Sequence, residues 1–365
     1  MILDKLGQIK ISNTKIIDLP RGKKLHLAIL GIGVWIMISL LIWALWALLS
    51  WGLATLLCLS PFVLLMIVSA SLLVRGSFRH LRLVIREFEV EQTRAQALQA
   101  AARAPFPEEW AKLIIKKSSL YRRLPEQLKT KLHQLINLFL YKIDFAPLEG
   151  EEPPIEITEE MRVLVAAEAS VLILNLRTDP IECINLYDVV KKVHIAQNLI
   201  DGNVVGQWRS NGSLVLVWPY TIDDSKTSED KSNVTIHEFA HALDSAADSK
   251  CDGNPFELKE KKRRGKHVEI QLFDGRAFEA KEIESANQWQ EIIDAMREDL
   301  EKIYKLRGGN NVISEYGSTN PTEFFAVATE VYFDQPKNLQ KVAPDVYRLI
   351  NLFYELDPAE WPRGN

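Results

Sequence analysis

The longest uncharged stretch of this chain constrains its fold more than any other feature. Residues 27–74 contain no Asp, Glu, Lys or Arg. One helix of that length would measure about 72 Å at 1.5 Å per residue, more than twice the roughly 30 Å core of a bilayer. We therefore predict a hairpin of two transmembrane helices at residues 26–75. The tryptophans near its turn at Ser50-Trp51-Gly52 suit a membrane interface.

The charges that flank the hairpin predict its orientation. Arginines and lysines lie on both sides of it, at Arg21, Lys23, Lys24, Arg75, Arg79, Arg82 and Arg86, whereas the connecting turn is uncharged. The positive-inside rule then places both flanks in the cytoplasm. We expect an inner-membrane protein whose large C-terminal domain lies on the cytoplasmic side, after a cytoplasmic N-terminal tail at 1–25. A cleaved signal peptide is excluded, because its apolar core has only about 7–15 residues.

After the hairpin the sequence becomes polar and rich in helix-forming residues. Residues 76–104 predict a helical juxtamembrane stalk, and Pro105-Phe106-Pro107 marks a boundary. Residues 105–365 show mainly helical periodicity, with strand-like runs near 188–195 and 212–218. The predicted fold class is therefore α+β: a helix-dominated domain preceded by the two-helix hairpin.

Charge and cysteine content exclude other classes. The net charge of −4 over 365 residues gives no electrostatic basis for binding nucleic acid. Cys58, Cys183 and Cys251 are widely separated and odd in number, so they indicate neither a disulfide framework nor a zinc knuckle.

The segment that indicates chemistry reads His237-Glu238-Phe-Ala-His241. Histidines four residues apart project from the same face of a helix, where both imidazoles can bind one zinc ion. Glu238 would serve as the general base that deprotonates the attacking water. The alternative is a helix with two histidines that bond only to their neighbours. The apolar residues around the motif favour a helix buried under an active site.

Catalytic zinc usually has three protein ligands, and no histidine that could be the third follows closely. A carboxylate is the expected substitute, and the best source is the apolar segment that begins at Asn320-Pro321. Glu323 and Glu330 are seven residues apart and share a helical face, so either could reach the metal. A structural role for Glu323 in the first helical turn is the competing interpretation.

Several motifs together resemble the Mlc titration factor A family of bacterial zinc peptidases. The matching pieces are Pro107-Glu-Glu-Trp110, Tyr121-Arg-Arg-Leu-Pro125, Leu174-Asn-Leu176, Ile236 to Asp244, Pro321-Thr-Glu323-Phe-Phe-Ala-Val327 and Phe353-Tyr-Glu-Leu-Asp-Pro358. They occur in the family order and cover most of residues 105–361. The resemblance implies a gluzincin-like zinc peptidase domain at 105–365 that binds one zinc ion per chain.

The resemblance also implies roles for single residues. His237, His241 and Glu323, rather than Glu330, would be the zinc ligands, with Glu238 as the base. Tyr316 falls where the family has a functional tyrosine, whose phenol could donate to the developing oxyanion. Asp244 is expected to orient a ligand imidazole from the second coordination shell.

This chain departs from the family pattern by its hairpin and by a probable insert at 252–284. The insert contains a basic run, Lys259 to Lys266, and an Asp274-Gly275 turn that predicts a β-hairpin. The hairpin of this insert could cover the active-site cleft while its basic run contacts anionic lipid. A solvated surface loop is the favoured interpretation.

Two functions remain open on the sequence. The first is a membrane-anchored zinc peptidase that cleaves peptides or a protein, with aminopeptidase-like action possible and the strand at 212–218 receiving the substrate. The second is a membrane-tethered binding protein that sequesters a cytoplasmic transcriptional regulator, with a mainly structural zinc site. A channel is disfavoured, because the hairpin has no ionisable residue.

Overall fold

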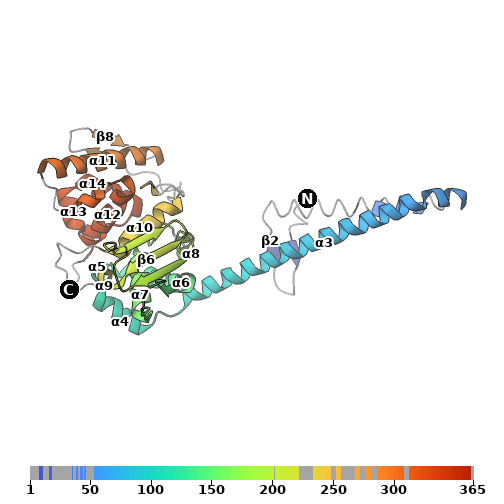
Figure 1. Ribbon diagram of the computed structural model, residues 1–365, viewed down its shortest axis with the longest axis horizontal. Coiled ribbons are helices and arrows are strands. Elements are labelled where there is room, and N and C mark those ends of the chain that lie inside the picture. The colour runs from blue at the N-terminus through green and yellow to red at the C-terminus, as the bar shows by residue number, and fades with distance from the viewer. Residues whose placement is uncertain are drawn as a thin grey trace. The chain divides into compact units, whose positions relative to one another are not determined.

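The computed structural model (Figure 1) divides the chain into two units, Met1–Ala95 and Gln96–Asn365. It describes residues 53–200, 202–221, 233–247, 252–255, 286–307 and 312–362, together with short pieces at 8–10, 16–18, 268–271 and 277–280 and single residues within 35–46. The helices are α3 Leu53–Arg103, α4 Glu108–Lys117, α5 Ser119–Arg123, α6 Glu126–Lys142, α7 Glu159–Leu172, α8 Pro180–Asn185, α9 Trp218–Thr221, α10 Val234–Ala247, α11 Ala286–Arg307, α12 Pro321–Asp334, α13 Pro336–Val342 and α14 Pro344–Tyr354, with 3-10 turns η2 Glu315–Ser318 and η3 Pro358–Glu360. The strands are β1 Gln8–Lys10, β2 Ile16–Asp18, β3 Asp144–Pro147, β4 Lys192–Ala196, β5 Gly206–Arg209, β6 Ser213–Val217, β7 Val268–Gln271 and β8 Ala277–Ala280.

The structure corrects the predicted transmembrane hairpin. Among the described residues, no helix combines the length and the apolar character that crossing a bilayer requires. The finding overturns the two-span fold at 26–75 and the inner-membrane location with a cytoplasmic catalytic domain. The predicted span and stalk are instead parts of one continuous helix, α3, which runs through Arg75 and Arg79 to Arg103. Counting uncharged residues could not reveal that continuity, and most of the first predicted span, 26–52, lies outside the described residues.

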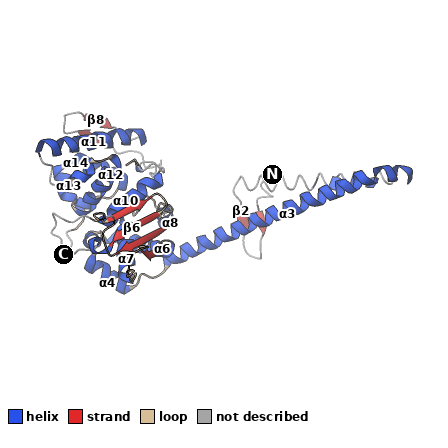
Figure 2. Cartoon of the chain, in the orientation of Figure 1, coloured by secondary structure: helices blue, strands red, loops and turns tan. Residues whose placement is uncertain are grey.

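The second unit contains a four-stranded sheet that lies among its helices (Figure 2). Its order is β3-β4-β6-β5, with β3, β4 and β6 parallel and β5 antiparallel to β6. β6 lies within the predicted strand at 212–218, but it is paired on both sides. The prediction that this strand receives substrate at its edge is therefore wrong, and β5 is the outer strand next to it.

Helix α10 lies at the centre of the unit, in contact with α12, α7, β5 and β6. Its apolar side chains pack into the main core; Phe239, for example, is fully buried between Phe139 and Tyr187. Helix α7 packs against α10 and is mostly buried after its charged first turn. Its N-cap is Thr158, whose hydroxyl accepts the Met161 N–H. The helix that carries the candidate site is thus enclosed on most sides.

The insert contains the predicted β-hairpin. β7 and β8 pair antiparallel, with Ile270 opposite Phe278, while the predicted turn at Asp274-Gly275 lies outside the described residues. The basic run at 259–266 lies outside the described residues.

A glycine allows β5 to approach α10 closely. A Cβ atom at Gly206 would lie 2.5 Å from Val234 Cγ1 and 2.7 Å from Glu238 Oε1, shorter than any ordinary contact. Any larger side chain would push the strand away from the glutamate. The close approach therefore depends on glycine at this position.

We predict that Gly206→Ala lowers the free energy of unfolding by about 1–3 kcal/mol, because overpacking at this contact forces the strand and helix apart. Thermal denaturation of the full chain measures the effect. Gly76→Ala is the control, since a Cβ there meets nothing within 4 Å. Equal melting temperatures for the two variants would contradict the prediction.

Candidate metal centre

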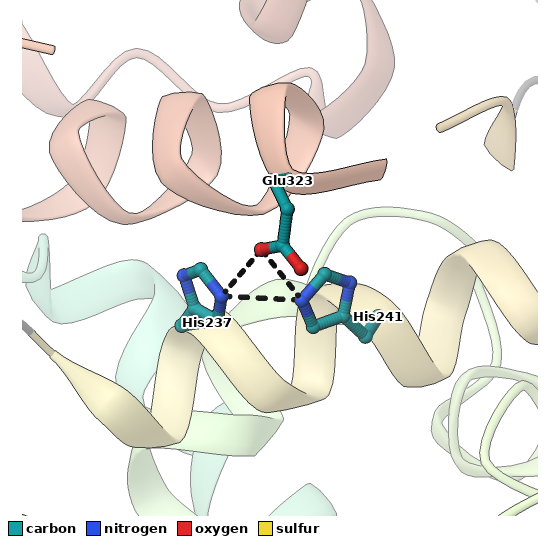
Figure 3. Close-up of side chains that lie close together, drawn as sticks. All are labelled: His237, His241 and Glu323. Carbon is teal, nitrogen blue, oxygen red and sulfur yellow. Dashed lines mark hydrogen bonds and ion pairs between the residues drawn. The ribbon is translucent and has the colours of Figure 1, made fainter. Parts of the chain in front are cut away.

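Three side chains from two helices converge between α10 and α12. His237 and His241 lie one turn apart on α10, and Glu323 lies in the first turn of α12 (Figure 3). The two Nε2 atoms are 3.1 Å apart, and Glu323 Oε2 lies 3.2 Å from the first and 3.3 Å from the second. In the described part of the chain, this is the one group whose three ligand atoms all lie within 4.8 Å of each other.

These donors fit a zinc ion. A tetrahedral zinc with ligands at about 2.0–2.1 Å has neighbouring ligand atoms about 3.4 Å apart. The three distances of 3.1, 3.2 and 3.3 Å are close to that value. Two imidazoles and one carboxylate are also a usual donor set for catalytic zinc. The residues present can therefore hold the ion that the sequence predicts.

The start of α12 places Glu323. Pro321 occupies the first turn, and the Asn320 side chain accepts the Glu323 N–H at 2.9 Å, which caps the helix. The carboxylate of this first-turn residue then points across to α10. The helix is capped by Asn320, so the competing interpretation, a structural role for Glu323 in this first turn, is not needed to explain how α12 begins.

Glu330 contacts the other side of the same imidazole. Its Oε2 lies 3.4 Å from His237 Nδ1, while Glu323 faces His237 Nε2. Because the two carboxylates are seven residues apart, they reach opposite nitrogens of one ring. Glu330 thus has the position of a residue that orients a ligand histidine. The sequence identified its helical face but not this role.

The local charges favour a cation at this point. Burial would lower the pKa of His237, but hydrogen bonds to Glu323 and Glu330 outweigh it and raise the pKa to about 10. Burial opposes ionisation of Glu323, yet its bonds to the two histidines hold the pKa of its carboxyl well below the ordinary value. A bound metal would take the place of the imidazolium proton.

Glu238 lies beside this group and is only 6% exposed. Burial raises the pKa of its carboxyl, although the neighbouring histidines and the Trp208 backbone N–H partly oppose the shift. A carboxylate with a raised pKa is a better proton acceptor near neutral pH. The contact with the Trp208 N–H ties the glutamate to β5.

Tyr316 comes from η2 and stands at the open side of the site, 56% exposed. Its ring centroid is 6.0 Å from that of His237. Partial burial, the nearby Glu323 charge and a hydrogen bond to that carboxylate raise the pKa of the phenol to about 12. The hydroxyl therefore keeps its proton at neutral pH and can act as a donor.

Asp244 supports the site by a route that the sequence did not predict. Its two carboxylate oxygens accept the N–H groups of Gly253 and Asn254 at 2.8 and 2.7 Å. A Cβ at Gly253 would lie 2.4 Å from the Pro321 carbonyl, so this loop packs directly on the start of α12. The described hydrogen bonds of Asp244 thus hold the loop behind Glu323. The nearby charge of His241 also acts on its carboxyl, and the orientation of a ligand imidazole by Asp244 stays a prediction.

We predict different metal binding for two carboxylate variants. Glu323→Ala should lose the zinc ion, because it removes a ligand. Glu330→Ala should keep about one ion per chain with roughly 10- to 100-fold weaker affinity, since it removes only the group that orients His237. Metal content after dialysis and competition with a chelator measure both effects. Complete loss of zinc in both variants would contradict the assignment.

We further predict that Asp244→Ala lowers the free energy of unfolding by about 1–3 kcal/mol, because two loop N–H groups lose their acceptor. Burial raises the pKa of Asp244 to about 6 from 3.8. Through this raised pKa, Asp244 contributes to the free energy of unfolding. The contribution is fully present below the ordinary pKa of 3.8 and is lost as the pH rises through about 6. The difference in melting temperature between wild type and Asp244→Ala should therefore become smaller as the pH rises from 3.8 to about 6. An unchanged melting temperature at every pH would refute this prediction.

Comparison with known proteins agrees with the geometry. Residues 90–355 match the family described as Glucose-regulated metallo-peptidase M90. An uncharacterized protein of Synechocystis sp. is 28% identical over 265 residues, which cover 70% of this chain and 86% of that protein. Mlc titration factor A of Escherichia coli is 26% identical over 65% of this chain and 82% of its own length. Its counterpart from Pectobacterium atrosepticum is 30% identical over 42% of this chain and 48% of its own length.

Proposed function

Since the chain belongs to the Glucose-regulated metallo-peptidase M90 family, we propose that it hydrolyses peptide bonds with one zinc ion bound by His237, His241 and Glu323. The observation that carries this proposal is the triangle of donor atoms between α10 and α12, with sides of 3.1 to 3.3 Å. A buried carboxylate lies beside that triangle, as hydrolysis by an activated water requires.

Each residue of the site has a chemical task in this proposal. When bound, zinc would lower the pKa of a water molecule and polarise the peptide carbonyl. Glu238 accepts the proton of the attacking water and later passes it to the leaving amine. Tyr316, protonated at neutral pH, donates a hydrogen bond to the oxygen that becomes negatively charged. Glu330 keeps the His237 ring in orientation through its Nδ1 atom.

Strand β5 is the proposed place for the substrate. It is the outer strand of the described sheet on the side of α10, and its Trp208 N–H contacts Glu238. An extended peptide added along β5 would bring a backbone carbonyl next to the base, as in other complexes formed by strand addition. Main-chain hydrogen bonds of this kind select extended segments more than particular side chains.

A second candidate function is the binding of a regulatory protein. It is favoured by the relatives named Mlc titration factor A, a name that refers to titration of another protein. In that case the metal centre would serve mainly to hold α10 and α12 together. Binding and hydrolysis can coexist, so the test must separate them.

We predict that Glu238→Gln lowers kcat on peptide substrates by about 10²- to 10⁴-fold, because it removes the base but no metal ligand. Tyr316→Phe should lower kcat by about 10²-fold with little change in KM, since the phenol acts mainly in the transition state.

Turnover of an internally quenched peptide library, together with zinc content, provides the measurement. Both variants should retain zinc and the thermal stability of the wild type. Full turnover by Glu238→Gln would refute the peptidase, and zinc-dependent binding of a regulator without any turnover would favour the second candidate.

A further inference from the structure

A chain of hydrogen bonds extends from the metal centre into the core behind His237. Glu330 Oε2 lies 3.4 Å from His237 Nδ1, and Glu330 Oε1 accepts the backbone N–H of Asn233 at 2.9 Å. Both oxygens of Glu330 are therefore engaged, one by the ring and one by the residue that precedes α10. The orientation of this carboxylate depends on where Asn233 is held.

The Asn233 side chain is itself held at both ends. Its Oδ1 accepts the Ile236 N–H at 3.1 Å, which caps the first turn of α10. Its Nδ2 donates to Glu168 Oε2 at 3.2 Å. One amide thus links the helix that carries the two histidines to α7, and rotation of the amide would break both bonds.

Glu168 fixes the far end of this chain. It projects from α7, and its other oxygen accepts the Ser118 hydroxyl at 2.6 Å. The same Ser118 oxygen accepts the Tyr121 N–H and caps α5. Burial raises the pKa of Glu168, whereas the donors Ser118 and Asn233 and the charge of Arg123 oppose the shift. Each carboxylate oxygen of Glu168 therefore has a defined donor.

A positive charge near this chain of hydrogen bonds offsets part of the cost of burying the Glu168 carboxylate. Arg123 donates to the Phe333 carbonyl at 2.6 Å and supplies the nearby positive charge. Asp334 is also buried there, and burial beside Glu330 and Glu168 raises the pKa of its carboxyl well above the ordinary value. The charge of Arg123 and a hydrogen bond from the Asn233 side chain oppose that shift, so Asn233 contacts both Glu168 and Asp334.

We propose that Glu168 is a positioning residue of the metal centre: it acts on His237 through Asn233 and Glu330, although it touches neither the ring nor a metal ligand. This inference rests on the proposed function, because it assumes that His237 binds zinc. Partners that orient a ligand histidine commonly contribute 10- to 100-fold to metal affinity. Glu168 lies two steps beyond Glu330, which faces the ring, so it should contribute at the lower end of that range.

The experiment compares zinc affinity in the full chain, measured by chelator competition well below the melting temperature. Glu168→Ala should weaken zinc binding about 10-fold, because the Asn233 Nδ2 group loses its bond to α7 and keeps only its contact with Asp334. Glu168→Gln should restore affinity to within about 3-fold of wild type, since its amide oxygen can accept the same N–H. Glu151→Ala is the matched control: Glu151, like Glu168, accepts hydrogen bonds from two residues, here the backbone N–H groups of Gln197 and Asn198, but it lies outside this chain of bonds.

A double-mutant comparison separates positioning from a general effect on folding. If Glu168 acts through Glu330, then Glu168→Ala should change zinc affinity less than about 2-fold in a Glu330→Ala background. In the zinc-loaded protein, the downfield Nδ1–H proton resonance of His237 should weaken or shift in Glu168→Ala and return in Glu168→Gln.

Should Glu168→Ala fail to fold, Asn233→Ser tests the same link, because serine retains the helix cap and removes only the amide donor. Its zinc affinity should also fall about 10-fold. Equal losses with and without Glu330, or a loss matched by Glu151→Ala, would overturn the inference. Absence of zinc binding by the wild type would instead refute the proposed function.

Discussion

The packing of α10 against α12 is the constraint on which the rest of the site depends. It brings two imidazole nitrogens and a carboxylate oxygen to within 3.1–3.3 Å of one another. Such a cluster of electron pairs is unfavourable in a protein interior unless a cation lies among them. The surrounding carboxylates supply negative charge that favours this cation. The arrangement of these side chains would therefore be stabilised by a divalent metal ion.

Two buried carboxylates next to the candidate metal centre, Glu330 and Asp244, hold parts of it in place. Glu330 faces the back of one ligand ring, while Asp244 binds the loop that packs on the first turn of α12. Glu330 contacts His237, and Asp244 acts on α12, the helix that carries Glu323, through the loop at Gly253. Both are buried carboxylates whose oxygens receive N–H donors, an arrangement that offsets the cost of burying them. Small movements of either would be transmitted to the ligand atoms.

The sheet reaches the candidate site through β5, the strand along which we propose that substrate binds. Because Gly206 has no side chain, β5 approaches the glutamate of the His-Glu-x-x-His motif directly. The strand that the sequence favoured for substrate, β6, is paired with β4 and β5 and has no edge to offer. A strand can be recognised from an apolar run, but its place in the sheet depends on pairing with segments far away in the chain. The same limit applied to the apolar N-terminal region, where length and lack of charge predicted a hairpin, whereas the structure describes one continuous helix from Leu53 to Arg103.

The sequence alone was sufficient where the chemistry is local. The spacing of His237 and His241 places both rings on one helical face in any α-helix, and Glu238 follows from the same few residues. Asn320 and Pro321 likewise specify the start of α12 through local capping. Only the tertiary structure shows which nitrogen of the His237 ring each carboxylate faces. Glu323 and Glu330 are 86 and 93 residues beyond His237 in the sequence, and they share a helical face. The register of α12 against α10 determines which nitrogen of the ring each of them reaches. That register is set by side-chain packing across the whole core, which no local pattern encodes.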